Sequence, residues 1–122
     1  MGARVLIVDD LAFIKLIIRD TLEKTGFEVA GEASNGVEAV DMYKRLKPDI
    51  VLMDITMPRM DGIQALQEIM KSDGAAKVIM CSALGQQKLI IQSIQLGAKD
   101  FIVKPFKPER IVGAIKKALN MP

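Results

Sequence analysis

Histidine is absent from this 122-residue chain, and cysteine occurs once, as Cys81. Without histidine the chain can hold no His-ligated metal, no Ser-His-Asp triad and no phosphohistidine donor. A single cysteine excludes an internal disulfide and a cysteine-rich zinc site. Any bound metal must therefore be held by oxygen ligands, which favours Mg²⁺, Mn²⁺ or Ca²⁺.

The sequence also lacks a strong charge of either sign and a long apolar run. Its net charge of +2 is too small to indicate nucleic-acid binding, which usually needs a concentrated basic patch. No apolar run approaches the roughly 20 residues of a membrane span. The start, MGARVLIVDD, is not typical of a signal peptide. We therefore expect a cytoplasmic protein, one domain over residues 1–122, with no nucleic-acid or membrane partner.

Five short apolar runs alternate with five segments of helical period. The predicted strands are Val5–Val8, Phe27–Ala33, Ile50–Met53, Val78–Cys81 and Phe101–Val103. The predicted helices are 12–24, 36–46, 62–71, 86–96 and 109–119. The first, third and fourth runs are nearly all apolar, as strands covered on both faces are, whereas the second alternates like an edge strand. This pattern predicts an α/β fold with a doubly wound, five-stranded parallel sheet and five helices.

Reactive side chains stand where four of the five predicted strands end. Asp9 and Asp10 follow the first strand, Asp54 the third, Ser82 the fourth and Lys104 the fifth. Ligands of such sheets bind beyond the carboxyl ends of the strands. We therefore expect three carboxylates, a hydroxyl and an ammonium group at one face of the molecule.

Each of these residues also has an ordinary structural interpretation. Asp9, Asp10 and Ser82 could cap the helices that follow them, and Lys104 could be a solvated surface charge. Their convergence favours a functional site, because crowded carboxylates raise one another's pKa values unless a cation is present. Mg²⁺ typically combines a few carboxylates with waters and phosphate oxygens. An Asp carboxylate beside Mg²⁺ can be a nucleophile toward a phosphoryl group and needs no general base, so the missing histidine is no obstacle.

Four segments together resemble the receiver domain of two-component response regulators. They are VLIVDD (5–10), DIVLMDITMPRMDG (49–62), MCSA (80–83) and GAKDFIVKPF (97–106). They are spread through the whole chain in the order and spacing of that family. The resemblance implies a flavodoxin-like (CheY-like) sheet with strand order 2-1-3-4-5.

The resemblance also implies a role for each residue of the site. Asp54 would be the phosphorylated aspartate. Asp10 and Asp54 would bind Mg²⁺, with Mn²⁺ as an alternative metal, and Asp9 would help largely through water. The backbone carbonyl of Thr56 would be the remaining protein ligand. Lys104 would pair with the phosphoryl group.

Further residues of the resemblance concern how a signal would leave the site. The bond from Lys104 to Pro105 would be cis. Ser82 is the expected switch hydroxyl, which would move to bond a phosphoryl oxygen. Phe101 is the expected switch aromatic, which would rotate inward behind a loop made mobile by Gly85. The surface of the fourth helix, fifth strand and fifth helix would then change by a population shift.

The run MCSALGQQ, followed by GAKDFIVKPF, is similar to chemotaxis response regulators of the CheY type. That similarity implies a sensor His kinase as donor and the flagellar motor switch protein or its adaptor as output partner, with a phosphatase as a further candidate. The chain ends just after the fifth predicted helix. We therefore expect a diffusible, stand-alone, monomeric switch in preference to a DNA-binding regulator. Such a switch catalyses its own phosphorylation and dephosphorylation but is not a turnover enzyme.

Three other functions are compatible with parts of the pattern. A phosphorelay intermediate would share the site and pass its phosphoryl group to a His-phosphotransfer protein. A flavin-binding flavodoxin-like module would want a loop rich in Ser, Thr or Gly after the first strand, where this chain has Asp-Asp-Leu-Ala-Phe. A hydrolase of the aspartyl-phosphate type would need a second Asp two residues after the first as acid/base, where Thr56 stands.

The first predicted helix carries more apolar residues than one buried stripe needs. They are Leu11, Phe13, Ile14, Leu16, Ile17 and Ile18. We interpret them as core packing in preference to a partner or dimer surface. Cys81 and the abundant methionines are also expected to fill the core.

Overall fold

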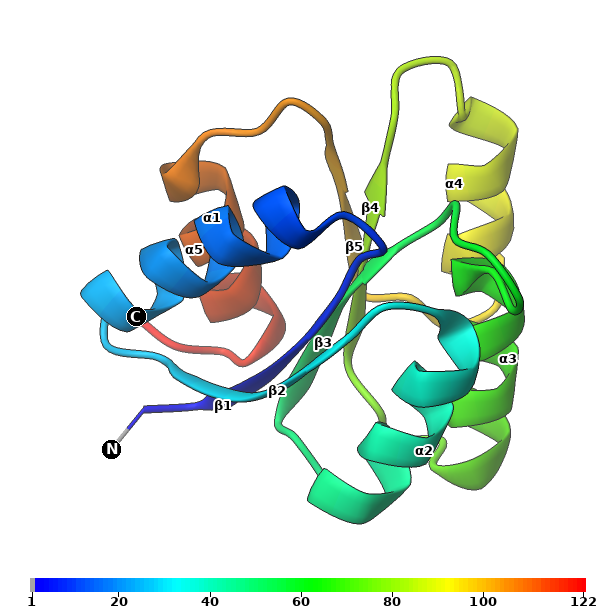
Figure 1. The fold of residues 1–122 in the computed structure, drawn as a ribbon, viewed down its shortest axis with the longest axis horizontal. Coiled ribbons are helices and arrows are strands. Elements are labelled where there is room, and N and C mark those ends of the chain that lie inside the picture. Colours follow the sequence, from blue (N-terminus) through cyan, green and yellow to red (C-terminus); the bar gives the residue numbers. More distant parts are fainter. Residues whose placement is uncertain (1) are drawn as a thin grey trace.

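A computed structural model of the chain describes residues 2–122. Five helices cover the two faces of a five-stranded sheet (Figure 1). The strands are β1 (Arg4–Val8), β2 (Glu28–Ala33), β3 (Ile50–Asp54), β4 (Val78–Ser82) and β5 (Asp100–Val103). The helices are α1 (Ala12–Lys24), α2 (Gly36–Leu46), α3 (Gly62–Ser72), α4 (Gln87–Gln95) and α5 (Pro108–Ala118). Every predicted element is present, and its ends differ from the prediction by a single residue at most. Within the described residues, no helix has the length and apolarity that crossing a membrane requires.

The sheet order is β2-β1-β3-β4-β5, and all neighbouring strands are parallel. This order confirms the predicted flavodoxin-like arrangement. The winding reverses at β1, which lies between β2 and β3, so the carboxyl ends of β1 and β3 adjoin at the switch point. In the register, Val8 lies opposite Met53, and Asp54 lies opposite Cys81. Asp9 and Asp10 therefore leave β1 beside Asp54.

Alternate residues of the central strands belong to two separate cores, because successive side chains point to opposite faces of a sheet. In β3, Val51 and Met53 pack with residues of α2, α3 and α4, whereas Ile50 and Leu52 pack with residues of α1 and α5. Figure 1 shows these two groups of helices on opposite sides of the sheet. Burial of both faces explains why β3 is a continuous apolar run. Cys81 is buried in the core on the side of α1 and α5, as predicted.

The start of α3 is fixed directly behind the end of β3. A capping box holds the first turn: Asp61 Oδ1 accepts from the Gln64 backbone N–H at 2.8 Å, and the Gln64 side chain accepts from the Asp61 N–H at 3.1 Å. A Cβ on Gly62 would collide with the carbonyl oxygen of Asp54. Only glycine therefore allows α3 to begin this close to the strand end that carries Asp54.

Helix α1 packs differently from the prediction. Only one stripe of it, which includes Ile18 and Leu22, is buried against the sheet and α5. The remaining apolar residues form what we call the α1 apolar face: Leu11 (55% exposed), Phe13 (70%), Leu16 (62%) and Ile17 (38%). The prediction that these residues belong to the core is wrong, because no element covers that side of α1 in residues 2–122. The α1 apolar face begins immediately after Asp10.

Candidate functional site

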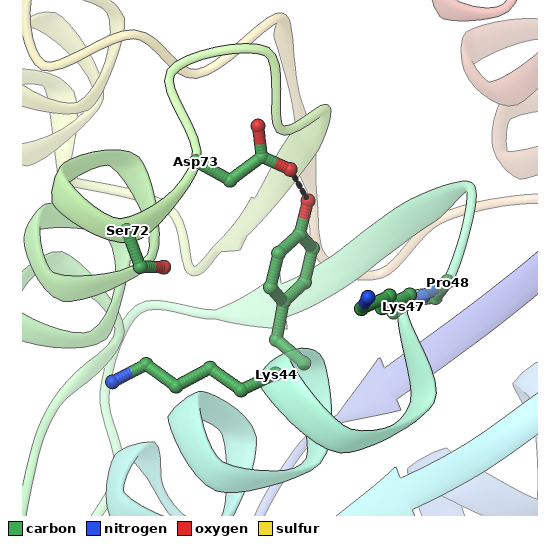
Figure 2. Close-up of a pocket in the computed structure, with 6 residues that line it drawn as sticks. Lys44, Lys47, Pro48, Ser72 and Asp73 are labelled. Atoms are coloured by element: carbon green, nitrogen blue, oxygen red, sulfur yellow. Dashed lines mark hydrogen bonds between the residues drawn. The ribbon is translucent and has the colours of Figure 1, made fainter.

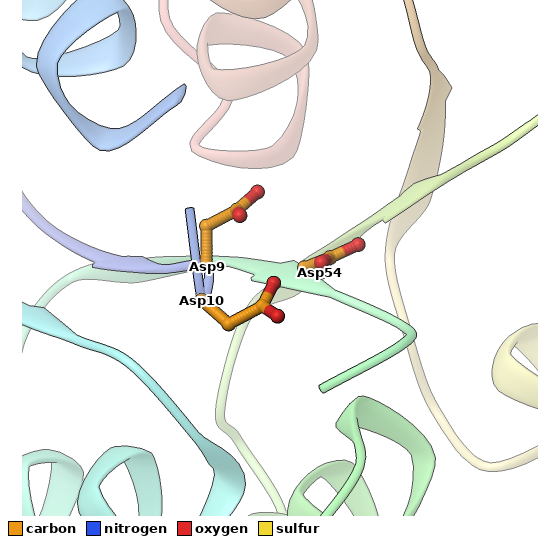
Figure 3. Close-up of side chains that lie close together, drawn as sticks. All are labelled: Asp9, Asp10 and Asp54. Carbon is orange, nitrogen blue, oxygen red and sulfur yellow. The ribbon is translucent and has the colours of Figure 1, made fainter. Parts of the chain in front are cut away.

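Three carboxylates, those of Asp9, Asp10 and Asp54, meet at the carboxyl ends of β1 and β3 (Figure 3). Each offers an oxygen, and these oxygens all lie within 4.8 Å of one another. Asp9 and Asp54 are buried, whereas Asp10 is exposed. We call this group the acidic cluster. Oxygen donors that carry this much negative charge match the preferences of a hard divalent cation.

Lys104 reaches the acidic cluster from the end of β5. Its Nζ lies 2.8 Å from Asp9 Oδ2 and 3.3 Å from Asp54 Oδ1. The side chain is only 21% exposed, so the interpretation of Lys104 as a solvated surface charge is wrong. The peptide bond to Pro105 is cis, as the resemblance implies. One ammonium group thus bridges two of the three carboxylates and leaves the cluster with an excess of negative charge.

The interpretation of the Asp9-Asp10 pair as a helix cap is also wrong. The N-cap residue of α1 is Leu11, and it makes no side-chain cap hydrogen bond. Asp9 Oδ1 does accept a hydrogen bond from the Leu11 backbone N–H at 2.9 Å. That bond fixes the Asp9 side chain while its other oxygen, Oδ2, pairs with Lys104. Asp9 is therefore oriented by the turn toward the site.

The surroundings shift the ionisation of Asp54 and Lys104. Burial raises the pKa of Asp54 to about 6; the charges of Asp9 and Asp10 add to this rise, and the charge of Lys104 opposes it. Burial tends to lower the pKa of Lys104, but the hydrogen bond to Asp9 and the charges of Asp54 and Asp9 outweigh it, so that this pKa is raised. Near pH 7, Asp54 is therefore mainly ionised and Lys104 is protonated.

Ser82 ends β4 with a hydroxyl that has no hydrogen-bond partner. Its Oγ is fully buried and is the one buried side-chain oxygen or nitrogen without a partner in residues 2–122. The helix-cap interpretation is wrong here too, because the N-cap residue of α4 is Gln86. Leaving a buried hydroxyl unpaired costs about 1–3 kcal/mol. Such a group calls for a specific explanation, and an acceptor oxygen bound at the neighbouring Asp54 would supply one.

Sequence reasoning missed a glutamine that joins two loops of the site. Gln86 Oε1 accepts a hydrogen bond from the Ala83 backbone N–H at 2.6 Å, and Gln86 Nε2 donates one to Thr56 Oγ1 at 2.9 Å. The turn between Ala83 and Gln86 contains Gly85 at φ +88°, a conformation that favours glycine. Gln86 belongs to the run MCSALGQQ, but an uncharged side chain gives no sign in the sequence of a contact with Thr56, 30 residues away.

An apolar groove of about 420 Å³ lies beside the site, between α4 and β5. Its walls include Leu84, Gln86, Ile90 and Phe101. Phe101 is half-buried, so its ring has room on the side of the groove. The switching role of Phe101 and Ser82 stays a prediction.

A second hollow, of about 530 Å³, lies at the other end of the sheet, where α2 and α3 end (Figure 2). Its lining residues are Tyr43, Lys44, Lys47, Pro48, Ser72 and Asp73. The Tyr43 hydroxyl donates to Asp73 Oδ2 at 2.7 Å, and the Ser72 hydroxyl donates to the Ile69 carbonyl at 2.9 Å. These hydroxyls are already paired, so this hollow offers fewer groups to a ligand than the acidic cluster does.

Comparison with known proteins gives concordant results. The family model described as the response regulator receiver domain matches residues 5–116. Chemotaxis protein CheY of Thermotoga maritima is 63% identical over 96% of this chain and 98% of that protein. Chemotaxis protein CheY of Bacillus subtilis is 59% identical over 98% of this chain and 100% of that protein.

Solved structures agree with the sequence relatives. A chain of the CheX-CheY-BeF3-Mg+2 complex from Borrelia burgdorferi superposes with a TM-score of 0.92 at 41% identity, covering 96% of this chain and 89% of that chain. The response regulator domain of Thermotoga maritima CheB gives a TM-score of 0.92 at 36% identity, over 100% and 99% of the two chains. The family match includes every strand end that contributes to the acidic cluster and its neighbours.

Proposed function

This chain belongs to the response regulator receiver family, and on that premise we propose that it accepts a phosphoryl group on Asp54 and thereby changes its affinity for partners in chemotaxis. One observation carries the proposal. The buried carboxylate of Asp54 lies within 3.3 Å of the Lys104 ammonium group, on the same edge as the unpaired hydroxyl of Ser82. A nucleophile, a positive charge and a free donor thus converge where the charge of a transferred phosphoryl group would develop.

The acidic cluster fits Mg²⁺. We assign Asp9, Asp10 and Asp54 to it as side-chain ligands, direct or through water, and the Thr56 backbone carbonyl as a further ligand. Three carboxylates opposed by one lysine leave negative charge that a divalent cation would neutralise. When bound, Mg²⁺ supplies positive charge to the oxygens of the transferred group.

In the proposed reaction, an ionised oxygen of Asp54 forms a bond to phosphorus. The bond from phosphorus to the donor atom breaks, and that atom keeps the electron pair. The Lys104 ammonium group then donates a hydrogen bond to one phosphoryl oxygen in place of Asp54. The Ser82 hydroxyl donates one to another phosphoryl oxygen. Asp54 is already mainly ionised near pH 7, so no base has to remove a proton from it.

Two surfaces support proposals about partners. The α1 apolar face begins directly after Asp10 and extends over about two helical turns, so we propose that a sensor His kinase packs against it while presenting its phosphohistidine to Asp54. The groove between α4 and β5 contains Phe101, and we propose that it binds the output partner, the flagellar motor switch protein or its adaptor. A phosphatase is a further proposed partner; the CheY relative from Borrelia burgdorferi, for comparison, is crystallised with CheX.

The relatives named for chemotaxis favour this function over a phosphorelay intermediate or a flavin-binding module. The flavin-binding alternative also conflicts with the site, because the loop after β1 presents Asp9 and Asp10 and would repel a phosphate. For the hydrolase alternative, Thr56 offers no carboxylate at the required position.

Incubation with acetyl phosphate and Mg²⁺, followed by intact mass measurement, tests the proposal. The parent should gain one phosphoryl group and Asp54→Asn should gain none. Asp41→Asn, which alters an exposed carboxylate on α2, is the control and should be labelled like the parent. Replacing Mg²⁺ with a chelator should prevent labelling. Equal labelling of the parent and Asp54→Asn, or a parent that neither acetyl phosphate nor beryllofluoride modifies, would contradict the proposal.

A further inference from the structure

The Gln86 side chain ties together the two loops that border Asp54. Its Oε1 accepts from the Ala83 N–H at 2.6 Å, and its Nε2 donates to Thr56 Oγ1 at 2.9 Å. We call this pair of hydrogen bonds the Gln86 bridge. A carboxamide has its acceptor and its donors on opposite sides. Both ends are used here, so truncating the side chain breaks both bonds at once.

The position of the Ala83 N–H makes the Gln86 bridge more than a loop contact. Ala83 directly follows Ser82, whose unpaired Oγ lies at the same strand end. A phosphoryl group on Asp54 would bring strong acceptor oxygens to this place. The Lys104 ammonium and the Ser82 hydroxyl are donors at this strand end. The Cys81 carbonyl faces β3 and the Ser82 carbonyl faces β5, so the alternation along a strand turns the Ala83 N–H back toward β3, and we count it as a third donor. Of these, the Ala83 N–H is held by an oxygen of the protein that is outside the acidic cluster.

We infer that Gln86 is a positioning residue that stabilises the resting form of the site by occupying the Ala83 N–H, and that it must release this N–H when Asp54 is phosphorylated. This inference rests on the proposed function of Asp54. The Gln86 oxygen and a phosphoryl oxygen compete for one amide proton. When Gln86 releases the Ala83 N–H, its hydrogen bond to Thr56 is weakened as well, because both bonds depend on one conformation of the Gln86 side chain.

The Gln86 bridge also connects the site with the groove between α4 and β5. Gln86 lines that groove together with Leu84, Ile90 and Phe101. A change of the Gln86 side chain therefore alters the wall of the groove directly, with no need for a longer chain of contacts. Gln86 thus bonds Thr56, whose backbone carbonyl is a proposed metal ligand, and Ala83, whose N–H is a proposed hydrogen-bond donor to the phosphoryl group. It also forms part of the proposed output surface.

When only a fraction of the protein is in the form that binds a ligand, the apparent Kd equals the intrinsic Kd divided by that fraction. Removing the Gln86 bridge should therefore tighten the binding of a phosphoryl mimic. Two hydrogen bonds between partly exposed groups correspond to a change of about three- to tenfold. The control is Gln92→Ala, which removes the same kind of side chain at an exposed position of α4 that neither lines the groove nor takes part in the Gln86 bridge.

Isothermal titration with beryllofluoride in excess Mg²⁺ measures this effect. Gln86→Ala should bind about three- to tenfold more tightly than the parent, and Gln92→Ala within about twofold of it. Thr56→Val keeps the backbone carbonyl and removes one of the two bonds, so its effect should be smaller. Adding Thr56→Val to Gln86→Ala should change nothing further, because both act on the same bridge.

Hydrogen exchange of the Ala83 amide, measured by NMR without Mg²⁺, gives a readout that needs no phosphoryl mimic. The amide should exchange more slowly in the parent and in Gln92→Ala than in Gln86→Ala. Equal exchange in all three proteins, or unchanged or weaker beryllofluoride binding by Gln86→Ala, would overturn the inference and leave the proposed function intact. A parent that binds no beryllofluoride would overturn the proposed function and this inference with it.

Discussion

At the carboxyl end of the sheet, three carboxylates share one lysine, the Ser82 hydroxyl is buried without a partner, and the α1 apolar face is exposed. At the amino end, the carboxylates of Asp49 and Asp73 each accept a hydrogen bond from the protein. Tyr43 donates to Asp73 at 2.7 Å, and the Arg4 backbone N–H donates to Asp49 at 2.7 Å. Both ends belong to the same sheet and the same two cores, so packing does not explain the difference. Unsatisfied groups collect where a ligand and partners are proposed to bind, and real proteins depart from local rules mainly at such sites.

Removing Lys104 should affect stability most. Lys104→Ala leaves Asp9 and Asp54 without their shared partner. We expect the free energy of unfolding at pH 8 without Mg²⁺ to fall by about 2–3 kcal/mol, less than for a fully buried pair because the Lys104 side chain is 21% exposed. The loss should shrink toward pH 5, since Asp54 then takes up a proton. Urea unfolding at both pH values measures it. Lys88→Ala, at an exposed position on α4, should have little effect, and an equal loss at both pH values would argue against carboxylate crowding.

Removing the charge of Asp54 should have the opposite effect. Burial raises the pKa of Asp54 to about 6, so between about pH 4 and 6 the folded state binds more protons than the unfolded state, and stability falls as pH rises through this window. Asp54→Asn should therefore be more stable than the parent by about 1–2 kcal/mol above pH 7, a value reduced for solvent screening from the ~3 kcal/mol of full linkage. The gain should vanish below about pH 4. Thermal unfolding without Mg²⁺ across this range measures it, and a variant less stable than the parent at pH 8 would refute the crowding argument.

The sequence predicts the elements well where both faces of an element are decided by composition. The continuous apolar run of β3 fits only the middle of the sheet, where both faces are covered. The position of Asp54 at the end of that strand is therefore predictable too. The cluster of strand ends is predictable for the same reason, because parallel strands bring their carboxyl ends to one edge. The sequence does not reveal which apolar residues of α1 are covered, since periodicity describes the helix and not its neighbours. Gln86 is missed because a neutral side chain becomes informative only when its two hydrogen-bond partners are seen.

The amino end offers the matching test of a satisfied contact. Tyr43→Phe removes the hydroxyl that bonds Asp73, and we expect a loss of about 1 kcal/mol in the free energy of unfolding. The bond from Tyr43, followed by that from the Ala75 N–H, lowers the pKa of Asp73. The stabilisation by the Tyr43–Asp73 hydrogen bond is therefore fully present above the ordinary Asp pKa of about 3.9. It is lost as the pH falls through the lowered pKa of Asp73. Urea unfolding at pH 7 and in acid checks this. Phosphoryl labelling of Tyr43→Phe should equal that of the parent; a labelling defect would mean that the two ends are coupled.

The smallest effect on stability is expected at the α1 apolar face. Phe13 is 70% exposed, so Phe13→Ser should change the free energy of unfolding by less than about 0.5 kcal/mol. Labelling by acetyl phosphate should stay at the parent level, because a small donor needs no docking surface. Phosphotransfer from a sensor His kinase should fall about tenfold, which corresponds to losing roughly 1.4 kcal/mol of contact with the partner. Val37→Ser, at an exposed apolar position on α2, should leave both reactions unchanged. If Phe13→Ser slows phosphorylation by acetyl phosphate and by the kinase equally, Phe13 affects the acidic cluster itself. If it slows neither reaction, the α1 apolar face is not the docking surface of the kinase. The carboxyl end of the sheet would then differ from the amino end only in the chemistry of its polar groups.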